Sequence, residues 1–184
     1  MQVGIHRHIA RICPVFRANA LNRDEYMVQN ASDLDQFDQA ILATLAEDGR
    51  ISITDLSKKI GLSKSPTQAR LRRLEENGVI LGYRAMLNPI RLGLDHVAFV
   101  EVRLTDTREA ALAAFNAAVA KVPQIEQAHM IAGNFDYLLK VRTRDMVSYR
   151  AFLGDTISAL PHVASTSTYV AMEAVKEVML SEGA

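Results

Sequence analysis

The segment from residue 51 to residue 78, ISITDLSKKIGLSKSPTQARLRRLEENG, restricts the possible folds more than any other part of the chain. Ser52 and Asp55 have the spacing of a capping box, in which the two residues exchange hydrogen bonds at the start of a helix. Gly61 has the conformational freedom that the end of a helix often requires. The pattern predicts a short helix followed at once by a tight glycine turn.

A second, basic helix is predicted directly after this turn. Pro66 suits the first turn of a helix, where its missing N–H costs nothing, with Ser65 as the cap and Ser63 as a competing cap. Gly78 ends the helix. Apolar residues at helical spacing predict a further helix over residues 35–47. Three helices of this length, the last two joined by a tight turn, form a helix-turn-helix.

The basic helix has two different sides. A projection at about 100° per residue clusters Thr67, Leu71 and Leu74 on a buried stripe and places small and basic residues around it. The early residues of a recognition helix reach base edges, while later arginines hold phosphates. We therefore predict contacts with double-stranded DNA from Lys64, Ser65, Gln68, Ala69, Arg70, Arg72 and Arg73. The structural alternative is a solvated basic face, and the narrow apolar stripe argues against membrane binding.

Charge and composition narrow the function classes. Residues 50–84 hold eight basic and three acidic residues in a chain of formal net charge zero, which points to an anionic partner. The single cysteine, Cys13, excludes an internal disulfide framework and a cysteine-based zinc cluster. No apolar run approaches the roughly 20 residues of a membrane span, and no secretion signal is evident, so we expect a soluble, cytoplasmic protein. No known catalytic, metal or cofactor motif occurs, so no cofactor is expected.

From residue 96 onward the chain alternates between extended and helical patterns. The order is strand, helix, strand, strand, helix, strand, over residues 96–104, 107–122, 125–133, 135–143, 145–160 and 163–175. This is the ferredoxin-like arrangement of an α+β domain, an antiparallel sheet with helices on one face. The other face needs cover as well, so we expect dimers joined sheet to sheet.

The predicted organisation has four parts. Residues 1–30 form a loose arm, residues 33–80 the helix-turn-helix domain, and residues 96–178 the ferredoxin-like domain. Residues 81–95 connect the two domains, and the extended character of VILGYRAMLNP, residues 79–89, predicts a strand that leaves the helical domain.

Three segments carry a resemblance to a known family: LDQFDQAILATLAEDGRIS, LSKKIGLSKSPTQARLRRLEENGVILGYRAMLNP and AGNFDYLLKVRTRDMVSYR. Together they resemble Lrp/AsnC transcriptional regulators, and further segments are similar to the proline-responsive activators of proline dehydrogenase genes. The resemblance implies a (winged) helix-turn-helix, a C-terminal RAM domain that senses a small amino acid, and homodimers that assemble into tetramers or octamers. Lys64 stands where much of the family has proline, so a relative's base preference does not carry over.

The resemblance also implies an effector site at the turn AGNFDY, residues 132–137. The matching turn of the family lines an amino-acid pocket between subunits, where glycine exposes backbone N–H groups and Asp136 could pair with an ammonium group. The structural alternative is an ordinary hairpin turn. The candidate effector residues are Gly133, Asn134 and Asp136 in the turn, with Thr166 and Thr168 as weaker candidates on the last strand.

One enzyme class shares the predicted architecture. Sirohaem decarboxylases resemble Lrp/AsnC proteins in both domains, and in such an enzyme His96, His129 or His162 could act as a ligand or proton donor. The arginine-rich helix favours the regulator, because a decarboxylase does not need to read DNA.

Overall fold

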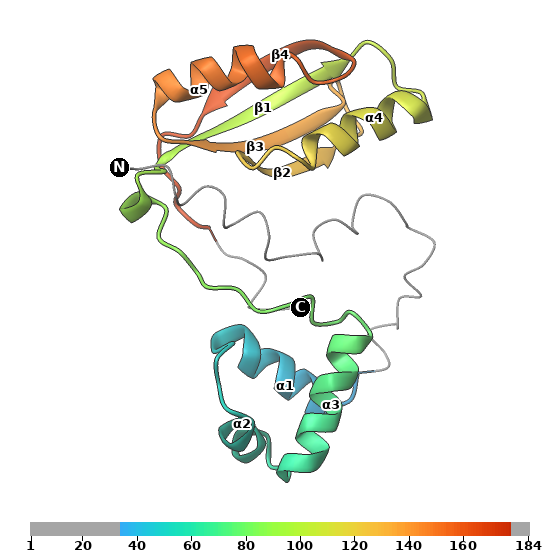
Figure 1. Cartoon of the computed structure of the whole chain (residues 1–184), viewed down its shortest axis with the longest axis vertical. Coiled ribbons are helices and arrows are strands. Elements are labelled where there is room, and N and C mark those ends of the chain that lie inside the picture. The colour runs from blue at the N-terminus through green and yellow to red at the C-terminus, as the bar shows by residue number, and fades with distance from the viewer. Residues whose placement is uncertain (1–33, 178–184) are drawn as a thin grey trace, which may run out of the picture. The chain divides into compact units, whose positions relative to one another are not determined.

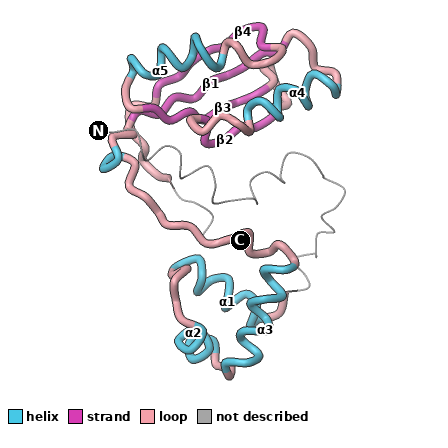
Figure 2. Tube along the Cα trace, viewed as in Figure 1, coloured by secondary structure: helices cyan, strands magenta, loops and turns pink. Residues whose placement is uncertain are grey.

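The computed structural model describes residues 34–177, which divide into two compact units, residues 34–86 and residues 87–175. Figures 1 and 2 show a helical unit and a unit built on a sheet, joined by an extended connection. The predicted arm, residues 1–30, and the last residue of the predicted C-terminal domain, residue 178, lie outside the described residues.

The helical unit has the predicted three-helix order: α1 (Gln36–Glu47), α2 (Ile53–Ile60) and α3 (Lys64–Glu76). Each of the three helices contributes at least one buried side chain to the core of this unit: Ile41 from α1, Leu56 and Ile60 from α2, and Leu74 from α3. Thr67 is also fully buried, and Leu71 packs against the core while half-buried. The inward stripe predicted for the basic helix is therefore confirmed.

The caps explain where the helices begin and end. Ser52 accepts a hydrogen bond from the backbone N–H of Asp55, and Gly61 ends α2 with φ +74°, a left-handed conformation that favours glycine. The cap of α3 is Ser63, so the prediction that placed Ser65 at this position is wrong. The hydroxyl of Thr67 donates to the Ser63 carbonyl at 2.9 Å, which ties the earlier residue to the first turn.

Residues 81–88 form neither helix nor strand, so the strand predicted over residues 79–89 is wrong. An extended segment becomes a strand only when a neighbour takes up its backbone hydrogen bonds, and every strand of the described sheet belongs to the second unit. The apolar side chains of this connection are exposed instead; Met86, for example, is 86% exposed. A short 3₁₀ turn, Ile90–Leu92, precedes the sheet.

The second unit has the predicted β-α-β-β-α-β order. Its elements are β1 (His96–Leu104), α4 (Glu109–Val119), β2 (Ile125–Met130), β3 (Tyr137–Thr143), α5 (Met146–Phe152), η5 (Leu153–Ile157) and β4 (Val163–Val170). The sheet order is β2-β3-β1-β4 with every neighbouring pair antiparallel, which confirms the ferredoxin-like topology. The predicted second helix is a short α-helix followed by one π-helical turn, η5.

Alternation along the strands sorts side chains between two faces of the sheet. Val100, Val102 and Leu139 are fully buried and share one core with Phe115 of α4 and Phe152 of α5. Both helices therefore cover the same face. The opposite face is open among the described residues.

The open face is only partly polar. Phe99 of β1 is 37% exposed, and its partner in the register, Tyr169 of β4, is 54% exposed. Lys140 and Arg142 of β3 also lie on this face and pair with Glu126 of β2.

Candidate DNA-reading helix and effector loop

The early turns of α3 present an exposed surface. Because Thr67 and Leu74 anchor the helix from the opposite side, a set of polar, small and basic side chains is left in solvent: Lys64, Ser65, Gln68, Ala69 and Arg72. The N-cap of α3 is Ser63, and the side-chain amide of Gln68 makes no capping hydrogen bond. The side chains of Gln68 and Arg72 make no hydrogen bond or ion pair with any other described residue. Both are available to a ligand.

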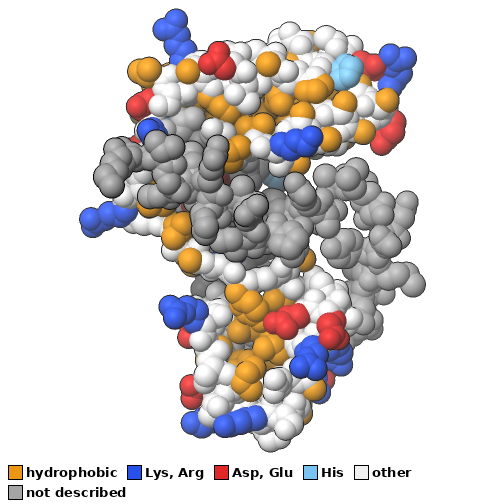
Figure 3. Space-filling view, viewed as in Figure 1, with side chains coloured by type: hydrophobic (Ala, Val, Ile, Leu, Met, Phe, Trp, Pro, Cys, Tyr) orange, Lys and Arg blue, Asp and Glu red, His pale blue; other side chains and the backbone are white. Residues whose placement is uncertain are grey.

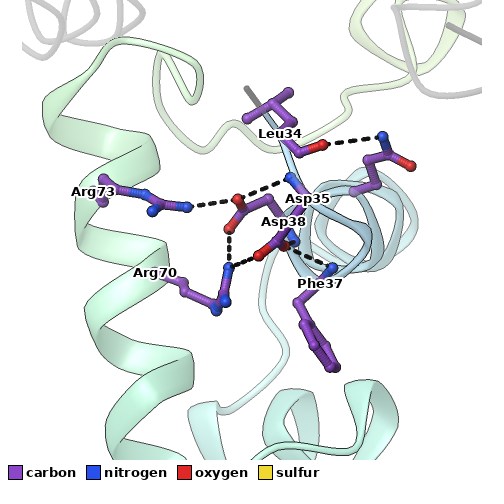
Figure 4. A network of polar contacts seen from close by, with 7 residues as sticks. Leu34, Asp35, Phe37, Asp38, Arg70 and Arg73 are labelled. Atoms are coloured by element: carbon purple, nitrogen blue, oxygen red, sulfur yellow. Dashed lines mark hydrogen bonds and ion pairs between the residues drawn. The ribbon is translucent and has the colours of Figure 1, made fainter. Parts of the chain in front are cut away.

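Arg70 is not part of this exposed surface. Its Nη1 donates to Oδ2 of Asp35 at 2.6 Å and to Oδ1 of Asp38 at 3.0 Å, and its guanidinium lies 5.4 Å from the ring centroid of Phe37. These three partners stand at the start of α1 (Figure 4). The hydrogen bonds that Arg70 donates to both carboxylates raise its pKa, so its charge is permanent.

Arg73 turns toward the same place from the next turn of α3. Its Nη2 donates to Oδ2 of Asp38 at 2.5 Å, while about half of the side chain remains exposed (Figure 4). The side chain of Asp38 is 1% exposed. The structure thus gives Arg70 and Arg73 carboxylate partners within the protein, whereas the sequence predicted contacts with DNA.

The two aspartates also cap α1. The side chain of Asp35 accepts from the backbone N–H of Asp38 at 2.9 Å, and the side chain of Asp38 accepts from the backbone N–H of Asp35 at 3.3 Å. The Asp38 N–H, and after it Arg70, hold the pKa of Asp35 below its ordinary value. One pair of carboxylates therefore both starts α1 and ties it to α3.

Tyr83 connects the exit from the helical unit to α3, a contact that sequence reasoning missed. Its hydroxyl donates to Oε1 of Glu75 at 2.9 Å. Burial, and then the hydrogen bond and negative charge of Glu75, raise the pKa of Tyr83 to about 12. No local sequence pattern predicts this hydrogen bond, because the apolar residues of the connection do not recur at helical or strand spacing.

The basic surface is interrupted by acidic groups. Figure 3 shows lysine and arginine side chains at several separate places on the visible face of the helical unit, with acidic side chains beside some of them. Lys59 pairs with Glu47 at 2.9 Å, and Lys58 lies 3.6 Å from Asp55. Such exposed pairs contribute little stability but reduce the local positive field.

The candidate effector turn connects β2 to β3 at one end of the sheet. The backbone N–H of Ile131 donates to the Asp136 carbonyl at 2.9 Å and closes the loop, and Gly133 and Asn134 are exposed at its tip. A Cβ added at Gly133 would meet its nearest neighbour, Ile131, at 3.4 Å, which is an ordinary contact. The fold itself therefore does not require glycine at this position.

Asp136 already has a partner within the protein. Its Oδ2 accepts from the backbone N–H of Leu104 at 2.7 Å, and its own N–H donates to the Val102 carbonyl at 3.0 Å. Leu104 lies at an irregularity in the β1–β4 register, where the carboxylate supplies the acceptor. In the structure Oδ2 of Asp136 therefore accepts a hydrogen bond from the last residue of β1, whereas the sequence predicted that this side chain pairs with an ammonium group.

The two threonines of β4 lie on the helix-covered face. Thr166 pairs in register with Val102, which pairs on its other side with Tyr137, so Thr166 and the end of the effector turn are one strand apart. Thr168 lies farther along, and its Oγ1 is 2.6 Å from the Tyr149 hydroxyl of α5. Burial raises the pKa of Tyr149. The structure brings Thr166 near the turn but gives Thr168 a partner in the core.

The three described histidines lie at different places in the second unit. His96 starts β1 and has its Nδ1 2.9 Å from Thr143 Oγ1, whereas His129 is exposed on β2. His162 precedes β4 with φ +62°, and its carbonyl accepts from the Thr105 N–H. Residues 34–177 contain no group of three or more histidine, cysteine, aspartate or glutamate side chains that could hold a metal ion. In the same residues, no helix is long and apolar enough to cross a membrane.

Comparison with known families gives matches in both units. Residues 34–80 match a winged helix-turn-helix DNA-binding model, and residues 97–180 match the Lrp/AsnC ligand binding domain. A proline dehydrogenase transcriptional activator of Rhizobium radiobacter is 61% identical over 145 residues, which cover 79% of this chain and 93% of that protein. The leucine-responsive regulatory protein of Escherichia coli is 48% identical over 145 residues, with 79% and 88% covered.

A solved structure shows the same architecture. A transcriptional regulator from Neisseria meningitidis in complex with L-methionine superposes with a TM-score of 0.75 at 31% identity, covering 82% of this chain and 96% of that one. These relatives are regulators, so the decarboxylase alternative is wrong and the chain is not an enzyme. Both units, in this order, are matched by regulators that join a DNA-binding helix-turn-helix to a ligand-binding domain, and the chain belongs to the Lrp/AsnC family of transcriptional regulators.

Proposed function

We propose that this protein is a cytoplasmic, homo-oligomeric regulator of amino-acid metabolism genes that reads its operator with the exposed early turns of α3. The single observation that carries the proposal is the division of α3 into an anchored side and a free side. Gln68 and Arg72 stand on the free side with no partner among the described residues, beside exposed Lys64 and Ser65. Glutamine pairs with adenine and arginine with guanine in the major groove, so this set has the chemistry of direct readout.

The proposed effector is a small amino acid, with proline as the first candidate because a relative is a proline dehydrogenase activator. Its site is the turn between β2 and β3. Exposed Gly133 and Asn134 offer backbone N–H groups to a carboxylate, and Thr166 lies one strand away. Because Oδ2 of Asp136 is used by Leu104, this aspartate contributes to the site by holding the turn in place.

The oligomer is proposed to form through the open face of the sheet. Phe99 and Tyr169 expose apolar area there, and the same face carries the half-buried ion pairs of Glu126 with Lys140 and Arg142. Burying this face against a second copy would present two α3 helices to two half-sites of one operator. If the effector binds two assembly states with different affinities, it shifts the population toward the state that it binds more tightly. The affinity for DNA then changes by at most the free energy of that difference.

The test is a gel-shift titration of the full chain on the upstream region of its own gene, with a scrambled fragment of equal length as the control. Salt is varied, and each titration is repeated with single amino acids, proline among them. Specific binding that weakens steeply with salt is the expected result, because cations that meet phosphates release counterions. A change in affinity with one amino acid identifies the effector. Equal affinity for both fragments at every salt concentration would refute the proposal.

A further inference from the structure

We infer that Asp38 is a positioning residue for DNA reading. Through Arg70 and Arg73 it fixes the rotation of α3 about its own axis, and Arg73 acts there rather than on a DNA phosphate. The inference rests on the proposed DNA-reading function, and it gives an acidic residue outside α3 a share in specificity. Nothing in the sequence of α3 itself points to this residue.

The contacts restrain rotation because they hold two points of one helix. Arg70 and Arg73 are three residues apart, so they leave α3 on the same side, one turn above the other. Both reach the same carboxylate, Arg70 through Oδ1 and Arg73 through Oδ2 (Figure 4). A carboxylate that is itself fixed in a capping box cannot follow the helix as it turns. Rotation of α3 in either direction therefore breaks at least one ion pair.

Burial makes this restraint stronger than an ordinary surface pair. The side chain of Asp38 is 1% exposed and that of Arg70 is 25% exposed, so water competes poorly for this contact. A buried carboxylate that loses its cationic partners has a large desolvation cost. Orientations of α3 that move Arg70 and Arg73 away from Asp38 are therefore disfavoured. Arg70 also pairs with Asp35, which holds its guanidinium from a second direction.

The apolar core alone restrains this rotation weakly. Of the α3 side chains, only Thr67 and Leu74 are fully buried, and they lie in nearly one line along the helix. With side chains, a helix is about 10–12 Å in diameter, so a roll of about 20° moves the outer atoms by roughly 2 Å. Hydrogen bonds to base edges tolerate much smaller errors. The ion pairs therefore determine whether Gln68 and Arg72 meet the intended bases.

The test separates a positioning arginine from a phosphate-binding one by the salt dependence of binding. Arg73→Ala is compared with Arg72→Ala, a neighbour of the same type that makes no ion pair with any described residue. A cation held against DNA, at a base edge or beside a phosphate, displaces counterions, so removing it reduces the steepness of log K against log salt by up to about 0.9. Arg72→Ala is expected to lower both affinity and slope. Arg73→Ala is expected to weaken specific binding about tenfold with a slope close to that of the wild type, and to weaken binding to scrambled DNA much less, through the general field alone.

Asp38→Asn supplies the second readout, because asparagine keeps the shape of the side chain and removes its charge. The variant is expected to lose specific affinity, as Arg73→Ala does. If only the overall charge of the protein mattered, removing a negative charge would instead strengthen binding to DNA. In the double variant the two reductions in affinity should not add, since both changes break the same ion pair. Circular dichroism at the assay temperature confirms that each variant is folded.

Two results would overturn the inference. One is a slope that falls in Arg73→Ala as far as in Arg72→Ala, which would make Arg73 a phosphate contact. The other is unchanged or higher specific affinity in Asp38→Asn. If Asp38→Asn does not fold, the slope of Arg73→Ala decides alone, because that side chain is half exposed and its removal leaves Asp38 paired with Arg70. Failure of the wild-type protein to prefer its operator would refute the proposed function instead.

Discussion

Replacing Asp136 separates the structural role of this residue from a direct role in effector binding. Its Oδ2 accepts the backbone N–H of Leu104 at 2.7 Å, a short hydrogen bond to a charged acceptor. Bonds to charged groups contribute about 1.5–3 kcal/mol, and half-burial of the carboxylate places this one near the lower end. Asp136→Ala is therefore expected to destabilise the protein by about 1.5 kcal/mol. Asp136→Asn, which keeps an amide oxygen as the acceptor, should cost about half of that.

The assay is equilibrium unfolding in urea at one fixed protein concentration, because assembly contributes to the apparent stability. Effector affinity is measured on the same variants by calorimetry, at temperatures where both are folded. If Asp136 holds the turn in place, stability and effector affinity fall in the same order, with alanine worse than asparagine. The reasoning is refuted if both variants unfold like the wild type while effector binding disappears, since Asp136 would then contact the ligand alone.

Four other variants test separate parts of the structure. Leu74→Ala should cost about 3 kcal/mol by opening a cavity in a small core, so thermal melting should show the helical unit unfolding before the sheet. The depressed pKa of Asp35 means that its contribution is complete above about pH 4 and lost as pH falls further; Asp35→Asn should flatten that acid limb of a pH–stability curve. Gly133→Ala should leave stability in urea unchanged yet weaken effector binding measured by calorimetry. Tyr83→Phe should lower the free energy of unfolding by about 1 kcal/mol at neutral pH, measured by urea unfolding. This difference from the wild type should shrink between about pH 10 and pH 12, because the raised pKa stabilises the folded state only while the phenol is protonated.

Regular elements were predictable because their signals are local. Residues 96–104 are rich in β-branched side chains and alternate between apolar and polar positions from Val100 to Leu104, and the structure has a strand with the bounds predicted for this segment. The inward stripe of α3 likewise follows from helical spacing alone. The connection after α3 has a similar extended character, but strand formation depends on a neighbour, and no pattern within residues 79–89 reveals whether one is present.

The competition between Ser63 and Ser65 shows how a local signal can be ambiguous. Pro66 is compatible with any position in the first turn, because none of the first N–H groups has a partner within the helix. Either serine could thus precede the helix. In the structure the helix starts after Ser63, and the Thr67 hydroxyl donates a hydrogen bond to the Ser63 carbonyl. The orientation of Thr67 depends on the core in which it is buried, and the local sequence does not reveal that core.

The partners of the candidate site residues were not predictable, because they lie far along the chain. Asp38 precedes Arg70 by 32 residues, and Leu104 precedes Asp136 by the same separation. A helical projection correctly places Arg73 away from the core, but the side chain is long enough to reach around the helix to α1. Spacing determines which face a residue lies on, whereas tertiary packing determines what its charged end meets.

The same limit applies to charge. Residues 50–84 carry a net charge of +5, but the whole helical unit, residues 34–86, holds eight basic and seven acidic residues, a net charge of +1. The acidic residues of α1, Asp38 foremost, neutralise arginines that a window drawn around α3 counts as free. The positive field of the unit is therefore weak, and in the proposed function attraction to DNA depends on a few cations that make no ion pair with another described residue, such as Lys64 and Arg72. A reader built in this way gains specificity at the expense of non-specific affinity, because a displaced α3 has little remaining charge to hold it on the wrong sequence.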